Sequence, residues 1–600
     1  MSRLRIFTFI FLGTCAASPL VGENDALPPL SGGKVPQTVE EIWGDYDPQR
    51  EPVEAEVLKE WEEGEVVCRI VRFRIGIFKG VKSVMGGLYA FPRSGTRLPG
   101  LVQVHGGGQS ANLNAATTNA RRGYACLSLN WGGNPLNDGN YQKLWPTPGT
   151  DWGAMDGTHP PQRDPVNHFH ICSPNEWTID SVESPRNSAW LLVAIGVRRA
   201  LTFLEQQPEV DGKRLGIYGH SMGAKLTVMV AALDQRVRAA VPSCGGITDF
   251  PSEPHWENSH FCRRLSCPVM FLNPVNDFYG KVDDLNQAVE SLAAGKYRFA
   301  CAPNLDHRDL PEHFVCGPLW FDQHLQGAEP LPQTPECELT LKSPEGVPVA
   351  RVLPDISRPV QGVDVYYTQQ VRDAECPNPC WRHVAAKGGK SGWTAPLPLF
   401  SVERPLRVYA NVRYGLETPI AGAGYYYSLY SAREFVLSSR LLTASVERLR
   451  EAKLEPTDQP SLLIEAFDPG WERGWYVYNE NGTWPFRTNK LQDPKWKAPA
   501  KARLVLEVQS LQPGELVLEI DQHAAVCRLN GGEDWQSFSL SPGDFLTLDD
   551  DALADWSMAK ELVIADRIVQ RIDGRQKSLG GAWQGELPRF RRLRWEPDSR

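Results

Sequence analysis

The segment LGIYGHSMGAKLTVMVAAL, residues 215–233, places a serine between two glycines where a strand passes directly into a helix. Its first four residues are apolar and strand-like, and its second half repeats at helical spacing without Gly or Pro. A sharp strand-to-helix turn exposes a serine hydroxyl, and flanking glycines allow close backbone approach because they lack Cβ. The segment therefore predicts a nucleophile elbow that consists of Gly219, His220, Ser221 and Gly223.

The chain around this segment alternates strands and helices from about residue 66 to residue 325. The clearest helix is expected over residues 187–206, where apolar residues recur at intervals of three and four. Strands are expected at residues 66–74, 101–105, 125–130, 215–218, 239–241, 269–272 and 297–302. This alternation predicts an α/β fold with a mostly parallel sheet and helices on both faces.

A glycine run, His105-Gly106-Gly107-Gly108, ends the strand expected at residues 101–105, upstream of the serine. Such a run exposes N–H groups where a carbonyl oxygen could sit. We therefore expect an oxyanion hole made by the amides of Gly107, Gly108 and Met222.

A catalytic acid and base are expected after the serine, in that order. Asp277 follows the strand at residues 269–272, and His307 follows the next strand. His307 would carry the proton of Ser221, and Asp277 would orient the imidazole and stabilise its charged form. The sequence leaves four competitors open for these two roles: Asp249, Asp283, Asp284 and His313.

Residues 132–186 interrupt the alternation with a Gly-, Pro-, Asn- and Asp-rich stretch. A loop of this length inside a compact domain is usually functional, so we expect an insertion that forms one wall of the site. His159, His168 and His170 lie in it without the spacing of metal ligands, and no metal is predicted.

The domain boundaries follow from changes in composition along the chain. Residues 1–22 are predicted to be a signal peptide, with a basic start, a short apolar run and small residues. An α/β catalytic domain is expected over residues 23–327, a β-sandwich over 336–440 and a jelly-roll-like β-sandwich over 455–600. A short helix is expected at residues 443–454.

The aromatic residues of the last domain allow two interpretations. Trp471, Trp475, Trp484, Trp496 and Trp535 could stack on sugar rings or fill the core of the sandwich, and packing is the favoured interpretation.

Charge and cysteine content limit the partners and the compartment. The formal net charge of −9 and the absence of Lys/Arg blocks argue against nucleic acid and anionic membrane. We expect a secreted or periplasmic protein, with a lipid anchor at Cys15 as the less favoured alternative.

Twelve further cysteines follow Cys15, and Cys376 and Cys380 are the best candidates for a local disulfide. Buried thiols are at least as well supported for Cys126, Cys244 and Cys301.

Four motifs together resemble one family. GHSMG at residues 219–223, HGGG at 105–108, NDFYG at 276–280 and NLDH at 304–307 look like an α/β-hydrolase of the dienelactone hydrolase/acetyl xylan esterase type. The resemblance covers about half of the chain and implies a carboxylic-ester hydrolase that works through an acyl-enzyme without a cofactor. Dienelactone hydrolases use a cysteine nucleophile, so serine here favours ester over lactone chemistry. The long insertion also departs from a minimal dienelactone hydrolase.

The leading hypothesis is an exported serine esterase whose partner is an ester substrate, for example an acetylated polysaccharide such as xylan. The alternative is a serine peptidase of the prolyl oligopeptidase or X-prolyl aminopeptidase type, because the latter also places a jelly roll after its hydrolase domain. A third hypothesis is a binding protein on an inactive hydrolase scaffold.

Overall fold

The computed structural model describes most of the chain, namely residues 25–30, 33–44, 46–136, 144–145, 149–153, 155, 157, 169–170, 172–344, 346–421, 431–477 and 484–597. The predicted signal peptide, Cys15, His159 and His168 lie outside the described residues. Within the described residues, no helix has the length and apolar character needed to cross a bilayer.

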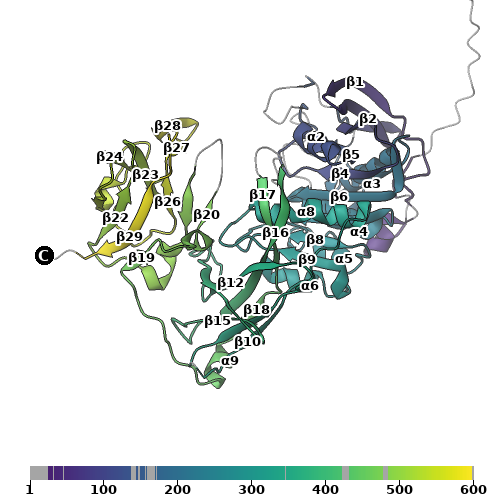
Figure 1. Ribbon diagram of the computed structural model, residues 1–600. Helices are drawn as coiled ribbons and strands as arrows, with labels where there is room; N and C mark the ends of the chain where they lie inside the picture. The colour runs from purple at the N-terminus through teal and green to yellow at the C-terminus, as the bar shows by residue number, and fades with distance from the viewer. Residues whose placement is uncertain are drawn as a thin grey trace, which may run out of the picture.

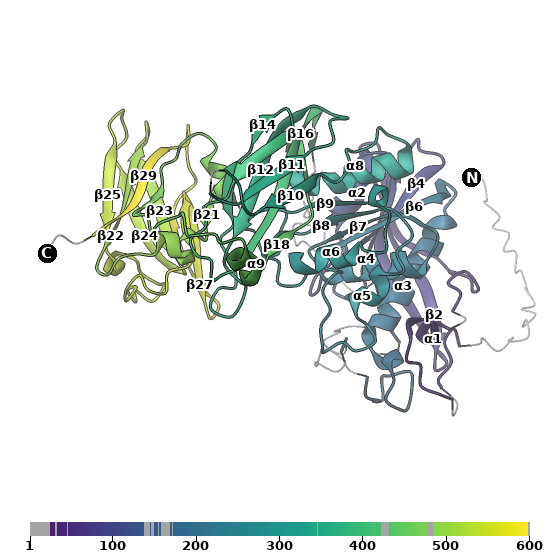
Figure 2. The same ribbon diagram turned by 90° about the horizontal axis from the view of Figure 1, so that it is seen from below.

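Three bodies follow one another along the chain, and the middle one lies between the other two (Figures 1 and 2). The α/β domain lies at one end, the middle β domain (strands between Glu336 and Ala444) lies beside it, and the C-terminal β domain (strands between Leu463 and Glu596) lies at the far end.

In the described residues, the α/β domain contains a nine-stranded sheet with the order β1-β2-β3-β5-β4-β6-β7-β8-β9. The strands are β1 (Glu56–Glu63), β2 (Val66–Phe78), β3 (Val81–Pro92), β4 (Leu98–Val104), β5 (Ala125–Leu129), β6 (Val210–His220), β7 (Val237–Ser243), β8 (Val269–Leu272) and β9 (Tyr297–Ala300). β1, β2 and β3 are antiparallel, and β4 to β9 pair in parallel. The predicted mostly parallel sheet is confirmed.

Helices cover both faces of this sheet (Figure 2). They are α1 (Val39–Trp43), α2 (Leu113–Arg121), α3 (Ala189–Glu205), α4 (Met222–Leu233), α5 (Asn258–Cys262), α6 (Leu285–Ala288), α7 (Pro311–Phe314) and α8 (Cys316–Phe321). α3 confirms the helix expected at residues 187–206, and Ser188 caps it by accepting from the amide of Trp190. α3 and α4 share one core cluster, whereas α8 belongs to the cluster on the other face.

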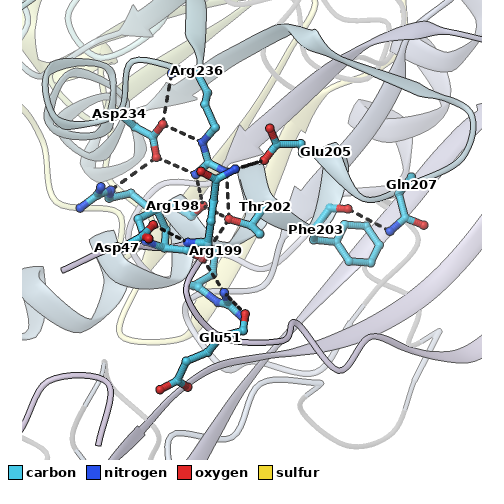
Figure 3. Close-up of polar contacts among 12 residues, drawn as sticks. Asp47, Glu51, Arg198, Arg199, Thr202, Phe203, Glu205, Gln207, Asp234 and Arg236 are labelled. Carbon is cyan, nitrogen blue, oxygen red and sulfur yellow. Dashed lines mark hydrogen bonds and ion pairs between the residues drawn. The ribbon is translucent and has the colours of Figure 1, made fainter.

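The segment before β1 is fastened to α3 by Arg199 (Figure 3). Its guanidinium donates to the carbonyls of Pro48, Glu51 and Pro52. Arg236 lies next to it and binds Asp234 Oδ2 at 2.7 Å. Because Arg236 directly precedes β7, this polar cluster lies at the amino ends of the parallel strands, opposite to the carboxyl ends where the elbow lies.

The middle β domain is a sandwich of two antiparallel sheets. One sheet has the order β10-β11-β15-β14, and the other has β13-β12-β16-β17 with β18 beside β16. The elements are β10 (Glu336–Thr340), β11 (Val349–Leu353), β12 (Val360–Thr368), β13 (Arg382–Ala385), β14 (Lys387–Gly389), β15 (Gly392–Pro396), β16 (Leu406–Ala421), β17 (Ser431–Ser438), β18 (Leu442–Ala444) and α9 (Val446–Glu451). The helix expected at residues 443–454 is therefore α9, shortened because residues 442–444 pair with β16.

The C-terminal β domain also contains two packed antiparallel sheets, with the orders β19-β29-β22-β25 and β20-β21-β26-β23-β24, and a separate β27-β28 hairpin. Its strands are β19 (Leu463–Glu465), β20 (Tyr476–Val477), β21 (Phe486–Thr488), β22 (Arg503–Gln509), β23 (Gly514–Ile520), β24 (His523–Leu529), β25 (Gln536–Leu540), β26 (Leu562–Ala565), β27 (Arg567–Ile572), β28 (Arg575–Gly580) and β29 (Arg589–Glu596).

The tryptophans of this domain mainly serve packing. Trp475 and Trp496 belong to its buried core, and Trp471 and Trp484 pack partly buried against it. The guanidinium of Arg591 lies over the ring of Trp535, with Arg591 Cζ 4.1 Å from the ring centroid.

The disulfide expected between Cys376 and Cys380 is wrong, because both are free thiols, as are the other cysteines of the described residues. Hydrogen bonds set this loop instead. Asp373 Oδ1 accepts from the amide of Cys376, and the amide of Cys380 donates to Gln370 Oε1. Cys380 is buried in a core cluster.

Candidate active site

Ser221 lies at the turn between β6 and α4, as the sequence predicts. Its backbone has φ 58° and ψ −123°, in the left-handed half of conformational space, which is costly for a residue with a Cβ and is typical of functional turns. Its amide donates to the carbonyl of Ser243 at the end of β7.

The flanking glycines have no room for a side chain. A Cβ on Gly223 would lie 2.1 Å from the carbonyl oxygen of Val104, and one on Gly219 would lie 2.5 Å from that of Gly223. The elbow therefore requires glycine on both sides of the serine.

The glycine run after β4 lies against this turn. A Cβ on Gly106 would lie 3.3 Å from Ser221 Cβ, and one on Gly107 would lie 2.6 Å from Met222 Sδ. Gly108 has φ 70° and open space around it. In the described part of the chain, no hydrogen bond occupies the amides of Gly107, Gly108 or Met222. The arrangement leaves these N–H groups available to a substrate oxygen.

His105 fixes the start of the run. Its Nδ1 lies 2.7 Å from the carbonyl oxygen of Gly106, and its Nε2 accepts from the amide of Gly132. The ring stacks on Trp131 with centroids 4.6 Å apart. Burial lowers the pKa of His105 to about 4, so the ring is neutral and acts as a hydrogen-bonded support.

Asp277 and His307 meet at the carboxyl end of the sheet. His307 Nδ1 lies 3.0 Å from Asp277 Oδ2, and Asp277 Oδ1 accepts from the amides of Tyr279 and Gly280, each at 2.6 Å. The aspartate side chain is fully buried, whereas that of His307 is 20% exposed. A buried carboxylate that orients a partly exposed imidazole is the arrangement that a general base needs.

Two rings flank His307. The ring of His220, the residue directly before Ser221, lies 4.8 Å away between centroids, so the imidazole of His307 reaches the elbow. The ring of Phe278 lies 4.4 Å away and is 54% exposed. Sequence reasoning missed Phe278, although its position directly after the predicted acid is a signal that could have identified it.

A second polar chain runs behind His307. His220 Nδ1 lies 3.1 Å from Ser243 Oγ, and Ser243 Oγ donates to Asp309 Oδ2 at 2.8 Å. Burial lowers the pKa of His220 well below its ordinary value, and burial raises the pKa of Asp309 to about 7. Neither Ser243 nor Asp309 was recognised from the sequence.

The competing residues have other contacts. Asp249 accepts from the amide of Ser259, and Asp283 binds Arg407. Asp284 is hydrogen-bonded to Thr248, and His313 is buried with Nε2 3.4 Å from Asn411 Nδ2. In the described residues, none of these four is hydrogen-bonded to the Asp277–His307 pair.

One group of potential metal ligands overlaps this site. Nitrogen atoms of His220 and His307 and Cys244 Sγ lie within 4.8 Å of one another. However, Nδ1 of each histidine already has a hydrogen-bond partner, and burial raises the pKa of the Cys244 thiol well above its ordinary value. A metal would therefore have to bind the two Nε2 atoms and a thiol that stays protonated, which disfavours a metal site here.

The described part of the insertion contributes to the core. Trp152, Met155 and Phe169 are each 1% exposed, and Phe169 packs against Trp131 and Trp190. The insertion thus supports the side chain on which His105 stacks. Its predicted role as a wall of the site remains a prediction.

A comparison of the sequence with family models matches residues 183–308 to the dienelactone hydrolase family. This stretch contains the elbow, the acid loop and His307. The domain is an α/β-hydrolase of the dienelactone hydrolase type.

Other similarities of the hydrolase domain are short or distant. A thiohydrolase from Arthrinium phaeospermum is 44% identical over 45 residues, which span 8% of this chain and 15% of that protein.

Among solved structures, an acetyl xylan esterase from Paenibacillus sp. R4 has a TM-score of 0.38 at 17% identity, with 49% of this chain and 97% of that chain covered. A glucuronoyl esterase from Solibacter usitatus has a TM-score of 0.33 at 13% identity, with 52% and 99% covered.

Proposed function

We propose that the protein is an exported serine carboxylic-ester hydrolase that works through an acyl-enzyme and removes acyl groups from a polysaccharide such as acetylated xylan. The observation that carries the proposal is Ser221 on a strained turn directly after His220, whose ring lies 4.8 Å from the imidazole that a buried carboxylate holds at 3.0 Å.

Acylation begins when Ser221 Oγ attacks the ester carbonyl carbon and His307 Nε2 takes the hydroxyl proton. The negative charge that develops on the carbonyl oxygen is met by the amides of Gly107, Gly108 and Met222. The bond to the alcohol oxygen then breaks, and His307 returns the proton to the leaving alcohol. Asp277 stabilises the imidazolium throughout.

Deacylation repeats these steps with water as the nucleophile. His307 takes a proton from the water, the hydroxide attacks the acyl carbon, and the bond to Ser221 Oγ breaks. The proton returns to the serine, and the free acid leaves. No cofactor takes part in this scheme.

A glycan substrate and export are supported by sequence and by one surface feature. The basic and apolar start of the chain is typical of a signal peptide, and two β domains follow the hydrolase domain. The exposed ring of Phe278 beside His307 offers an apolar face to a sugar ring. Fractionation of producing cells, with N-terminal sequencing of the mature protein, tests export.

The activity is tested with p-nitrophenyl esters of increasing acyl length, acetylated xylan and X-Pro p-nitroanilides, for the wild type and Ser221→Ala. The proposal expects hydrolysis of short esters and release of acetate from xylan, both lost by several orders of magnitude in the variant. Cleavage of the anilides without cleavage of esters would instead support the peptidase alternative.

A further inference from the structure

The loop that carries Asp277 is held from outside the hydrolase domain by its neighbour in sequence, Asn276. Asn276 Nδ2 donates to the carbonyl of Pro379 at 3.0 Å, and Asn276 Oδ1 accepts from the indole N–H of Trp381 at 3.1 Å. Pro379 and Trp381 belong to the middle β domain, about a hundred residues away in sequence.

The loop that carries His307 is held by the same tryptophan. Asn304 Oδ1 accepts from the amide of Trp381 at 2.7 Å, and Asn304 Nδ2 donates back to its carbonyl at 3.1 Å. Asn304 has φ 59°, a conformation that asparagine tolerates better than most residues. Asn276 also donates to the carbonyl of Asn304, so the acid loop and the base loop are joined to each other as well as to Trp381.

Arg372, also from the middle β domain, contacts the acid itself. Its guanidinium donates to the backbone carbonyl of Asp277, and its charge faces the carboxylates of Asp277, Asp306 and Asp283. This contact fixes the main chain at the residue whose side chain orients His307.

The contact region is buried. Asn276, Asn304 and Trp381 are at most 2% exposed, so a lost partner would leave a buried polar group unsatisfied. The ring of Trp381 is itself held between the guanidinium of Arg407, at 5.1 Å, and the edge of Tyr409.

We infer that the middle β domain is part of the catalytic apparatus, with Trp381 and Arg372 as positioning residues that hold Asp277 against His307. This inference rests on the proposed function. Displacement of a catalytic group by a fraction of an ångström lowers the rate of the chemical step more than it lowers substrate binding.

The test uses Arg372→Met and Trp381→Phe in the full chain, because each removes hydrogen bonding while keeping most of the side-chain volume. The matched control is Arg440→Met, since Arg440 bridges the same two domains by donating to Tyr297 Oη at the far end of β9. We expect kcat for p-nitrophenyl acetate to fall about 10- to 100-fold with KM within about twofold in both test variants. The control should keep its kcat.

A role in positioning also predicts rescue by a conservative variant. Arg372→Lys, which keeps one donor to the carbonyl, should recover most of the rate. Thermal melting shows whether each variant is folded. If Trp381→Phe does not fold, the inference is tested with Arg372→Met alone.

Wild-type kcat in both folded test variants would overturn the inference, and so would a change in KM alone, which would assign Arg372 to substrate binding. Ser221→Ala in the same assays separates the two claims. If it retains activity, the proposed function fails. If it is inactive while the two test variants match the wild type, only the role of the middle domain fails.

Discussion

Asp277 has two tasks that use different oxygen atoms. Oδ1 caps its own loop through the amides of Tyr279 and Gly280, and Oδ2 faces His307. The first task is structural and the second is catalytic, so they can be separated by a substitution.

Asp277→Asn should keep the loop and lose the reaction. Its carbonyl oxygen can still accept both amides, but its NH2 group would face His307 Nδ1 and favour the wrong tautomer. We expect kcat for ester hydrolysis to fall about 10³- to 10⁴-fold with KM little changed. Steady-state kinetics and thermal melting check this, and a loss smaller than tenfold would contradict the assigned role of Asp277.

Asp309 should make stability depend on pH. Burial raises its pKa from 3.8 to about 7 in the folded protein, so between these values the native state holds a proton that the unfolded chain has lost. The contribution of Asp309 to the free energy of unfolding therefore falls as pH rises from about 4 to about 7. Above about 7 it stays at this lower level.

Asp309→Asn removes this titration. The melting temperature of the variant minus that of the wild type should rise between pH 4 and pH 7 and then stay level. Calorimetry across this range measures the difference, and a constant difference would contradict the assignment.

At the scale of elements, the elbow depends on how closely β4, β6 and α4 approach one another. Gly223→Ala would place a methyl group 2.1 Å from the carbonyl oxygen of Val104, and backbone atoms there cannot move aside easily. We expect a loss of about 3 kcal/mol in the free energy of unfolding, together with loss of activity. Gly295→Ala is the control, because a Cβ at Gly295 meets nothing within 4 Å.

Urea denaturation of both variants gives the comparison. Equal stability of the two alanine variants would mean that the elbow is looser than the structure indicates.

The elements nearest the site were the most predictable. β8, the strand that leads into the loop with Asp277, is an uninterrupted apolar run and matches its predicted bounds, Val269–Leu272. β1 and β3 were missed: β1 is largely exposed, and Gly86 and Gly87 weaken the strand pattern of β3. The sequence also could not predict Trp381 beside Asn276, since that contact joins two domains across 105 residues.

At the scale of the whole molecule, Arg382 joins the two β domains. It binds both carboxylate oxygens of Asp493, at 2.9 and 2.6 Å, and Asp458 at 2.7 Å. The Arg382 side chain is 8% exposed and that of Asp493 is 3% exposed, so the bridge is buried.

Arg382→Met would leave the Asp493 carboxylate buried without its cation, at a cost of about 3–5 kcal/mol. We expect calorimetry to show a separate, earlier transition for the C-terminal β domain and proteolysis to release it sooner. Arg382→Met combined with Asp493→Asn should recover part of the loss because the unpaired charge is gone. An unchanged single transition in Arg382→Met would show that other contacts hold the two domains.

The central claim is that Ser221 is a nucleophile activated by His307, and covalent labelling tests it most directly. The full chain is treated with diisopropyl fluorophosphate, digested, and analysed by mass spectrometry for the peptide that contains Ser221. The account predicts one phosphoryl adduct on Ser221, formed in step with the loss of esterase activity and far more slowly in His307→Gln. An unlabelled Ser221 in a protein that has lost its activity to the reagent, or labelling that His307→Gln does not slow, would contradict it.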